Sequence, residues 1–117
     1  MKRESLFVYA REHFKAEPQY PWSKYPDYAV LRHHNKDNWF GLIMNVPSEK
    51  LRLTGNKKVD ILNVKVKPEL VGSLRQIDGI YPAYHMNKEH WISVLLDGPV
   101  SAEEIYEFLT ESYFLTS

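Results

Sequence analysis

Two amphipathic stretches frame this chain, and the sequence between them breaks into short apolar runs separated by turn residues. The first stretch predicts a helix over about residues 3–14, because its apolar residues recur at helical spacing. These residues are Leu6, Phe7, Ala10 and Phe14. A helix at each end with strands in between is typical of an α+β fold, in which helices cover one side of an antiparallel sheet.

The second amphipathic stretch carries the clearest helix start in the sequence. Ser101 and Glu104 have the spacing of a capping box, and Val100 and Ile105 are placed as its hydrophobic staple. One helical face is then traced by Ile105, Phe108, Leu109 and Ser112. We expect the N-terminal and C-terminal helices to pack on the same face of the sheet.

Turn residues divide the middle of the chain into strands. Residues 35–38, Asn-Lys-Asp-Asn, predict a hairpin turn between strands over 28–34 and 39–46, because Asn and Asp tolerate left-handed backbone. Residues 54–58 form a second turn with a basic tip, followed by a strand over 59–66. The remaining expected elements are a short helix from Pro68 through Leu74 and a strand over 90–96.

A proline-rich connection, residues 18–26, holds Tyr20, Trp22 and Tyr25. Flexible linkers are usually polar, whereas aromatic side chains are stabilised by burial. We therefore expect this loop to pack on the body of the protein. No repeat or low-complexity segment interrupts the chain. Residues 1–117 are therefore expected to form a single domain, with a monomer as the favoured state.

Composition excludes several classes of protein. The chain has 117 residues and no cysteine, which excludes disulfides, thiolate catalysis and cysteine-based metal sites. No apolar run approaches the roughly 18 residues of a membrane-spanning helix, and the N-terminal stretch lacks the apolar core of a signal peptide. We therefore expect a cytoplasmic protein without a membrane partner.

The charges balance overall but not along the chain. Fifteen basic and fifteen acidic side chains give a net charge of zero. Residues 32–67 carry eight basic and three acidic side chains, whereas residues 68–117 carry two basic and eight acidic ones. The folded molecule is either electrically dipolar or, if folding intermixes the charges, evenly mixed on its surface.

No constellation of side chains requires an enzyme, a metal or a cofactor. His33 and His34 are neighbours on an expected strand, so they point to opposite faces and cannot readily chelate one ion. His85 and His90 lie five residues apart, which matches no common zinc spacing. There is no Gly-x-Ser-x-Gly elbow, and the five glycines are scattered singly. We expect neither a catalytic nor a metal site.

The segment from His85 to Trp91, His-Met-Asn-Lys-Glu-His-Trp, is the most unusual in the chain. In the functional interpretation, Asn87 and Lys88 contact phosphates or base edges of a nucleic acid. In the structural interpretation, Trp91 lies in the core, Asn87 holds a turn and Lys88 is solvated. The spacing alone leaves both interpretations open.

Residues 82–98, Pro-Ala-Tyr-His-Met-Asn-Lys-Glu-His-Trp-Ile-Ser-Val-Leu-Leu-Asp-Gly, closely resemble the signature of the MmcQ/YjbR-like family of small bacterial proteins. Residues 21–28 and 39–44 look like the N-terminal half of that family, and residues 71–76 also fall in register. The resemblance covers roughly residues 5–113, and its most specific part is the Asn-Lys-x-His-Trp core.

The resemblance implies a frataxin-like (CyaY-like) fold, with two helices against an antiparallel sheet. It also implies DNA binding through a double-wing motif of two β-hairpins. The candidate nucleic-acid-binding residues are then the basic and polar ones of the turns and of the signature segment. They are Arg32, Lys36, Lys57, Lys58, Asn87, Lys88 and His90. Iron binding, as in frataxins, is not expected, because the first helix mixes basic with acidic residues.

Two alternatives to DNA binding stay open. A non-catalytic module would bind a protein or a small ligand through the aromatic loop of residues 20–28, and an apolar pocket beneath Trp22 and Tyr25 would favour it. An enzyme would use His85 or His90 as its acid–base group. A buried histidine bonded to a carboxylate within a cleft would favour that hypothesis.

Overall fold

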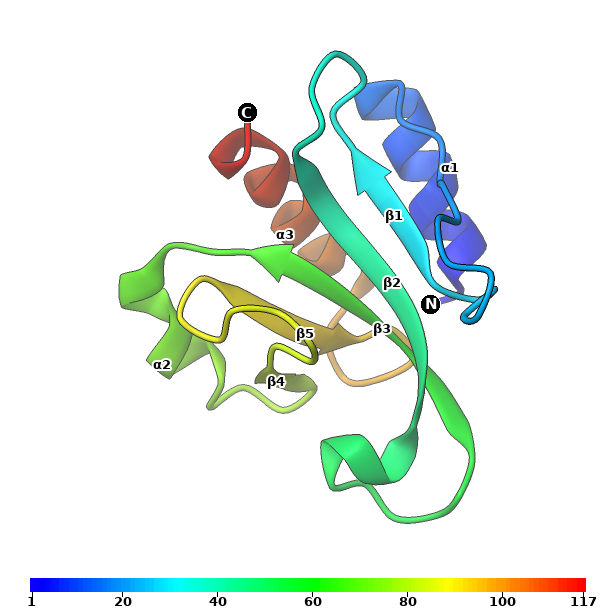
Figure 1. The fold of residues 1–117 in the computed structure, drawn as a ribbon. Coiled ribbons are helices and arrows are strands. Elements are labelled where there is room, and N and C mark those ends of the chain that lie inside the picture. Colours follow the sequence, from blue (N-terminus) through cyan, green and yellow to red (C-terminus); the bar gives the residue numbers. More distant parts are fainter.

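The computed structural model describes residues 1–117. Five antiparallel strands form one sheet in the order β1-β2-β3-β5-β4 (Figure 1). The strands are β1 (Ala29–Arg32), β2 (Trp39–Pro47), β3 (Lys58–Lys65), β4 (Ile80–Pro82) and β5 (Trp91–Leu95). The helices are α1 (Arg3–Phe14), α2 (Val71–Leu74) and α3 (Ala102–Leu115), with two 3₁₀ helices, η1 (Ser48–Leu51) and η2 (Pro68–Leu70).

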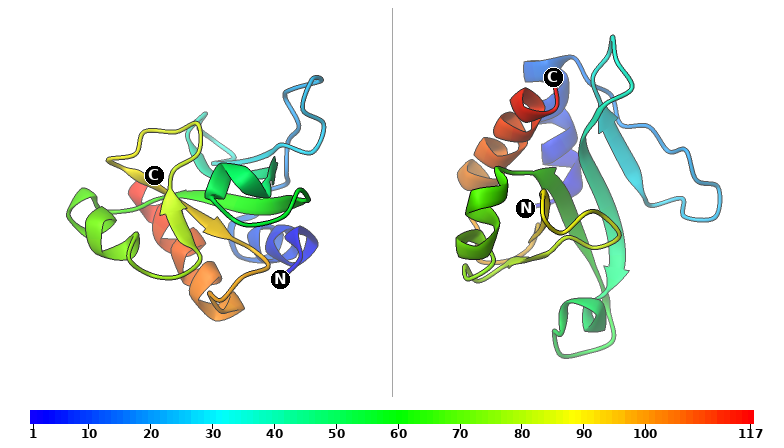
Figure 2. Two further views of the ribbon diagram at one scale, coloured as in Figure 1. Left: turned by 90° about the horizontal axis from the view of Figure 1, so that it is seen from below. Right: turned by 60° about the vertical axis from the view of Figure 1, so that its left-hand side comes forward.

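The two long helices, α1 and α3, lie on the same face of the sheet, as predicted (Figure 2). Phe7, Ile105 and Leu109 are buried beneath them, while Phe14 and Phe108 are partly buried and pack against the same core. Burial of these stripes supplies most of the free energy that holds the helices to the sheet. No helix in the structure has both the length and the apolar composition needed to span a membrane.

The second face of the sheet is covered by loops instead of a helix. Seven buried apolar residues form its core, against 19 on the helix-covered face. Leu51 of η1 is one of these seven. The loop side chains that pack on this smaller core are Trp22 and Tyr28 from the proline-rich connection, Leu53 after η1, and Tyr84 and Met86 from the segment after β4. The aromatic loop therefore packs on the body of the protein, as predicted.

Most of the predicted elements are confirmed within two residues, including both long helices and the hairpin turn of residues 35–38. The first strand is shorter than the predicted 28–34: it spans Ala29–Arg32. The sequence pattern does not predict β4, which has three residues and ends in Pro82. A strand this short has no room for the alternation that identifies longer strands.

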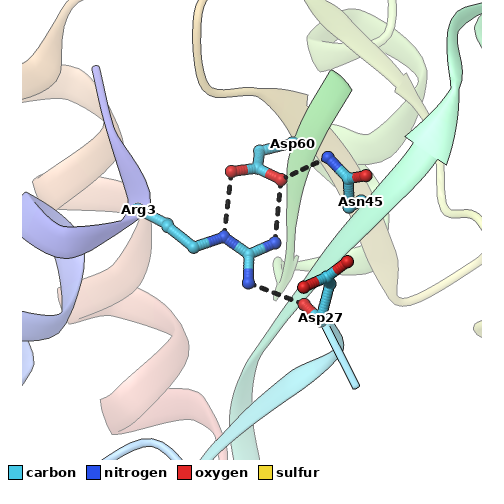
Figure 3. A network of polar contacts seen from close by, with 4 residues as sticks. All are labelled: Arg3, Asp27, Asn45 and Asp60. Atoms are coloured by element: carbon cyan, nitrogen blue, oxygen red, sulfur yellow. Dashed lines mark hydrogen bonds and ion pairs between the residues drawn. The ribbon is translucent and has the colours of Figure 1, made fainter. Parts of the chain in front are cut away.

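One ion pair connects the start of α1 to the sheet (Figure 3). The Arg3 guanidinium donates to both carboxylate oxygens of Asp60 on β3, at 2.9 and 2.8 Å, and to the carbonyl of Asp27 at 2.6 Å. Asn45 on β2 donates to the same carboxylate at 2.9 Å. Burial disfavours the charged form of Asp60, but the hydrogen bonds from Arg3 and Asn45 outweigh it and lower the pKa of this carboxyl.

We expect Asp60→Asn to lower the free energy of unfolding by about 2–3 kcal/mol, because it leaves the partly buried Arg3 without its counter-charge. The wild-type contribution should be fully present above the ordinary pKa of 3.8 and lost as the pH falls through the lowered pKa of Asp60. Urea denaturation across this pH range measures both effects. A variant as stable as wild type at neutral pH would contradict the assignment.

The second long helix starts as the sequence predicts. Ser101 Oγ accepts from the backbone N–H of Glu104 at 3.2 Å, and the Glu104 carboxylate accepts from the N–H of Ser101 at 3.5 Å. Val100 and Ile105 are both buried beside this capping box, as a hydrophobic staple requires. The box fixes where α3 begins and so aligns its apolar face with the sheet.

Replacing the cap by Ser101→Ala should reduce the free energy of unfolding by about 0.5–2 kcal/mol, because the N–H of Glu104 loses its acceptor. Ser101→Asn keeps a side-chain oxygen that can accept the same hydrogen bond and serves as the matched control. Thermal denaturation of the two variants compares them. Equal melting temperatures for both would show that the cap contributes little.

Candidate functional site

The connection between β4 and β5, residues 83–90, is held on the second face of the sheet by two buried polar side chains. Asn63 on β3 donates through Nδ2 to the carbonyl of Tyr84 at 2.8 Å, and Ser93 Oγ on β5 accepts from the N–H of Tyr84 at 2.9 Å. Ser93 Oγ also donates to Asn63 Oδ1. Both side chains are fully buried, so this network orients the connection where no strand pairing reaches it.

A tight turn ends the same connection. The side-chain oxygen of Asn87 accepts from the N–H of Glu89 at 2.7 Å, and its carbonyl accepts from the N–H groups of His90 and Trp91. Lys88 is exposed on this turn. Asn87 therefore holds a turn and Lys88 is exposed to solvent, as the structural interpretation of this segment expects, but Trp91 is only partly buried and belongs to neither core cluster.

Lys88 lines a cleft of about 370 Å³ between η1, β4 and the residue that follows α2. Four basic side chains and no acidic ones line this cleft, which we call the basic cleft. The four are Lys50, Arg52, Arg75 and Lys88. None of them takes part in an ion pair within the chain. Tyr81 and Tyr84 also line the basic cleft, so it offers partners for phosphates and for planar rings.

Two residues near the basic cleft have left-handed backbone, which non-glycine residues rarely adopt. Arg52, at the end of η1, has a φ of 60°, and His85, next to Tyr84, has a φ of 59°. Such backbone costs free energy and persists only where the surrounding structure holds it. Strain of this kind gathers at functional sites, and here it lies on both connections that border the basic cleft.

The structure separates the seven predicted site residues. Arg32 and Lys36 belong to the hairpin between β1 and β2, while Lys58, with Lys57 before it, starts β3 and pairs with Pro47 at the opposite end of β2. Figure 1 shows the two ends of β2 far apart. The nine residues of β2 put about 27 Å between these two ends. Of the seven residues, only Lys88 lines the basic cleft.

Most of the other predicted residues lie near acidic side chains or in hydrogen-bonded backbone. Arg32 forms an ion pair with the exposed Asp37, at 3.4 Å. Lys57 and Lys58 line a separate hollow that also contains two aspartates. The backbone of His90 bonds to that of neighbouring segments, and its side chain is partly buried. Arg32 therefore has an ion-pair partner, whereas Lys57 and Lys58 are exposed without one and differ from the basic cleft in having acidic neighbours.

The aromatic loop is packed on itself and on the sheet. Trp22 lies edge-on to Trp39 and Tyr28, with ring centroids 5.7 and 6.2 Å apart, and Tyr25 stacks on Tyr28 at 4.8 Å. Tyr20 and Tyr25 keep about half of their surface exposed. These contacts give the loop a structural role, and ligand binding by residues 20–28 stays a prediction.

The five histidines are spread over α1, the hairpin between β1 and β2, and the connection between β4 and β5. The histidine side chains with hydrogen bonds are His13 and His33, and neither bonds to a carboxylate. His33 is buried and His34 is exposed, so the pair points to opposite sides. No group of three or more His, Asp or Glu side chains is placed to hold a metal ion.

Sequence reasoning missed Lys50, Arg52 and Arg75, because these residues meet only in the folded chain. One signal was available in the charge distribution. Beyond residue 67 the chain has just two basic residues, Arg75 and Lys88, and both line the basic cleft. The two basic residues of the acidic half of the chain thus both belong to the basic cleft.

These observations define a class of small α+β proteins, in which helices cover one face of the sheet and a docked connection borders a basic cleft on the other. The same backbone fold is found in a crystal structure of a Pseudomonas syringae protein, with a TM-score of 0.97, 52% identity and 100% of both chains covered. Deinococcus radiodurans protein DR2400, with its DUF419 domain, gives a TM-score of 0.74 at 30% identity, covering 97% of this chain and 77% of that one.

The chain belongs to the YjbR family, whose family model matches residues 12–115. It is 47% identical over 116 residues to the uncharacterized protein YyaQ of Bacillus subtilis (strain 168), covering 99% of this chain and 98% of YyaQ. Protein YjbR of Escherichia coli (strain K12) is 40% identical over 53 residues, or 44% of this chain and 45% of YjbR. The family expected from the signature segment is thereby confirmed.

We expect Ser93→Ala to loosen the connection of residues 83–90, because the Tyr84 N–H and the Asn63 side-chain oxygen each lose a partner. The free energy of unfolding should fall by about 1–3 kcal/mol, and amide hydrogen exchange at Tyr84 should become faster. Ser73→Ala, which removes an exposed hydroxyl bonded only to a local carbonyl, is the matched control. Unchanged exchange at Tyr84 would contradict the role given to Ser93.

Proposed function

We propose that this protein binds DNA through the second face of its sheet, with the basic cleft as the phosphate-binding part. The observation that carries the proposal is the set of four basic side chains, without ion-pair partners, around a cleft that no acidic side chain lines. The chain as a whole has no net charge, so general basicity does not account for this concentration. Phosphate groups are the common anionic ligands of such lysine and arginine clusters.

The acidic side chains support the same orientation. Helix α3 carries four glutamates, and it packs on the opposite face of the sheet from the basic cleft. They are Glu103, Glu104, Glu107 and Glu111. A polyanion is repelled by this helix and attracted by the basic cleft, so it approaches the second face.

The proposal includes a double-wing arrangement on a frataxin-like fold. The wings we propose are the connections that border the basic cleft, residues 48–57 and 83–90, because both contribute basic side chains to it. The turn of residues 35–38 lies at the other end of β2 and contributes none. The frataxin-like assignment is supported by the two terminal helices on one face of an antiparallel sheet.

Two triple variants that remove equal charge test the proposal. The first replaces Arg52, Arg75 and Lys88 by alanine. The second, the matched control, replaces Lys36, Lys57 and Lys58 by alanine. We expect the first to bind DNA more weakly across sequences and to lower the slope of log affinity against log salt by up to about 0.9 per lost phosphate contact on duplex DNA. Mobility-shift titrations at several salt concentrations measure both quantities.

Circular dichroism should show that both variants fold, since all six side chains are exposed. If the two variants lose the same amount of DNA affinity, the turns contact phosphates as much as the basic cleft does. That result would overturn the cleft as the main binding site. Wild-type protein that binds no nucleic acid at about 50 mM salt, where electrostatic contacts are strongest, would refute DNA binding altogether.

A further inference from the structure

A second hollow, of about 550 Å³, lies at the edge of the sheet where β2 and β5 begin and β3 ends, beside the C-terminal end of α3, and it contains two of the three tryptophans of the chain. Trp39 on β2, Lys65 on β3 and Trp91 on β5 all line it. The other lining residues are Asp37, Asn38, Met86, Leu115, Thr116 and Ser117. We call it the tryptophan hollow, and neither its tryptophans nor Lys65 has a role in the proposed phosphate site.

One short segment of backbone separates the tryptophan hollow from the basic cleft. Tyr84 and Lys88 line the basic cleft, and Met86, between them in sequence, lines the tryptophan hollow. Tyr84 and Met86 are two residues apart, so their Cα atoms are at most about 7 Å apart. The two hollows therefore share the segment that Asn63 and Ser93 hold in place through Tyr84.

The two hollows differ in chemistry in the way that the two parts of a nucleotide differ. Cations without ion-pair partners in the basic cleft suit phosphates, whereas indole rings and a methionine in the tryptophan hollow suit the flat, apolar face of a base. Lys65 is the basic side chain of the tryptophan hollow. Its one acidic side chain, Asp37, is paired with Arg32.

We propose that the ligand is single-stranded DNA, with an unstacked base in the tryptophan hollow and the adjoining phosphates in the basic cleft. This inference rests on the proposed function and names its substrate class. In a duplex the bases are paired and stacked, so their faces cannot reach two tryptophan side chains set within a hollow. A single strand crossing the segment of residues 84–88 can place a base on one side and phosphates on the other.

The test uses tryptophan fluorescence of the wild-type protein, titrated at about 50 mM salt with a thymidine oligomer of about ten nucleotides and, separately, with a hairpin duplex. We expect the oligomer to bind more tightly than the duplex and to quench the fluorescence, because the base stacks on an indole. Trp39→Leu and Trp91→Leu should each weaken binding of the oligomer about 5- to 100-fold and leave duplex binding unchanged.

Trp22→Phe is the matched control, since Trp22 packs against Trp39 but does not line the tryptophan hollow. Lys65→Gln changes only a polar side chain at the hollow, and it should weaken oligomer binding severalfold even if a tryptophan variant fails to fold. Duplex binding at least as tight as oligomer binding, lost on removal of Arg52, Arg75 and Lys88, would overturn this inference and support the proposed function. Failure of both probes to bind would overturn both.

Discussion

Both faces of the sheet are apolar, but the two long helices cover only one of them, and this imbalance governs the rest of the structure. Loops must cover the second face, and buried loops bring N–H and carbonyl groups that need partners. Asn63 and Ser93 supply those partners for Tyr84 at the middle of the sheet. The second face is consequently a set of docked segments with hollows between them, instead of a plain core.

The candidate sites follow from this way of covering a sheet. Each hollow is lined by strand residues, whose position is fixed by pairing, and by a connection, whose position is fixed by a few specific bonds; the tryptophan hollow is also lined by the end of α3. Arg52 and His85 take unfavourable backbone conformations on two of these connections, which shows how closely the connections are constrained. Side chains that project from such segments, Lys88 among them, start close to the geometry in which they would bind.

Local signals made much of the fold predictable, and their absence explains what was missed. The capping box at Ser101 and the turn of residues 35–38 each mark an element within a few neighbouring residues. The three-residue β4 has no such mark. The basic cleft collects side chains from η1, the end of α2 and the segment after β4, and no sequence pattern records that these places meet. Lys36 and Lys57 look equivalent in the sequence, yet antiparallel pairing sends them to opposite ends of β2.

The buried pair that docks Tyr84 has a further consequence, for strand alignment. Asn63 and Ser93 sit directly opposite each other on β3 and β5, with Ile61 paired to Leu95 two residues along the same face. A slip of one residue would turn one strand over and carry its polar side chain into the helix-covered core. There it would be buried without a hydrogen-bond partner, at a cost of roughly 1–3 kcal/mol. The pair therefore helps to specify the register of β3 and β5, because misaligned pairing of the two strands is less stable.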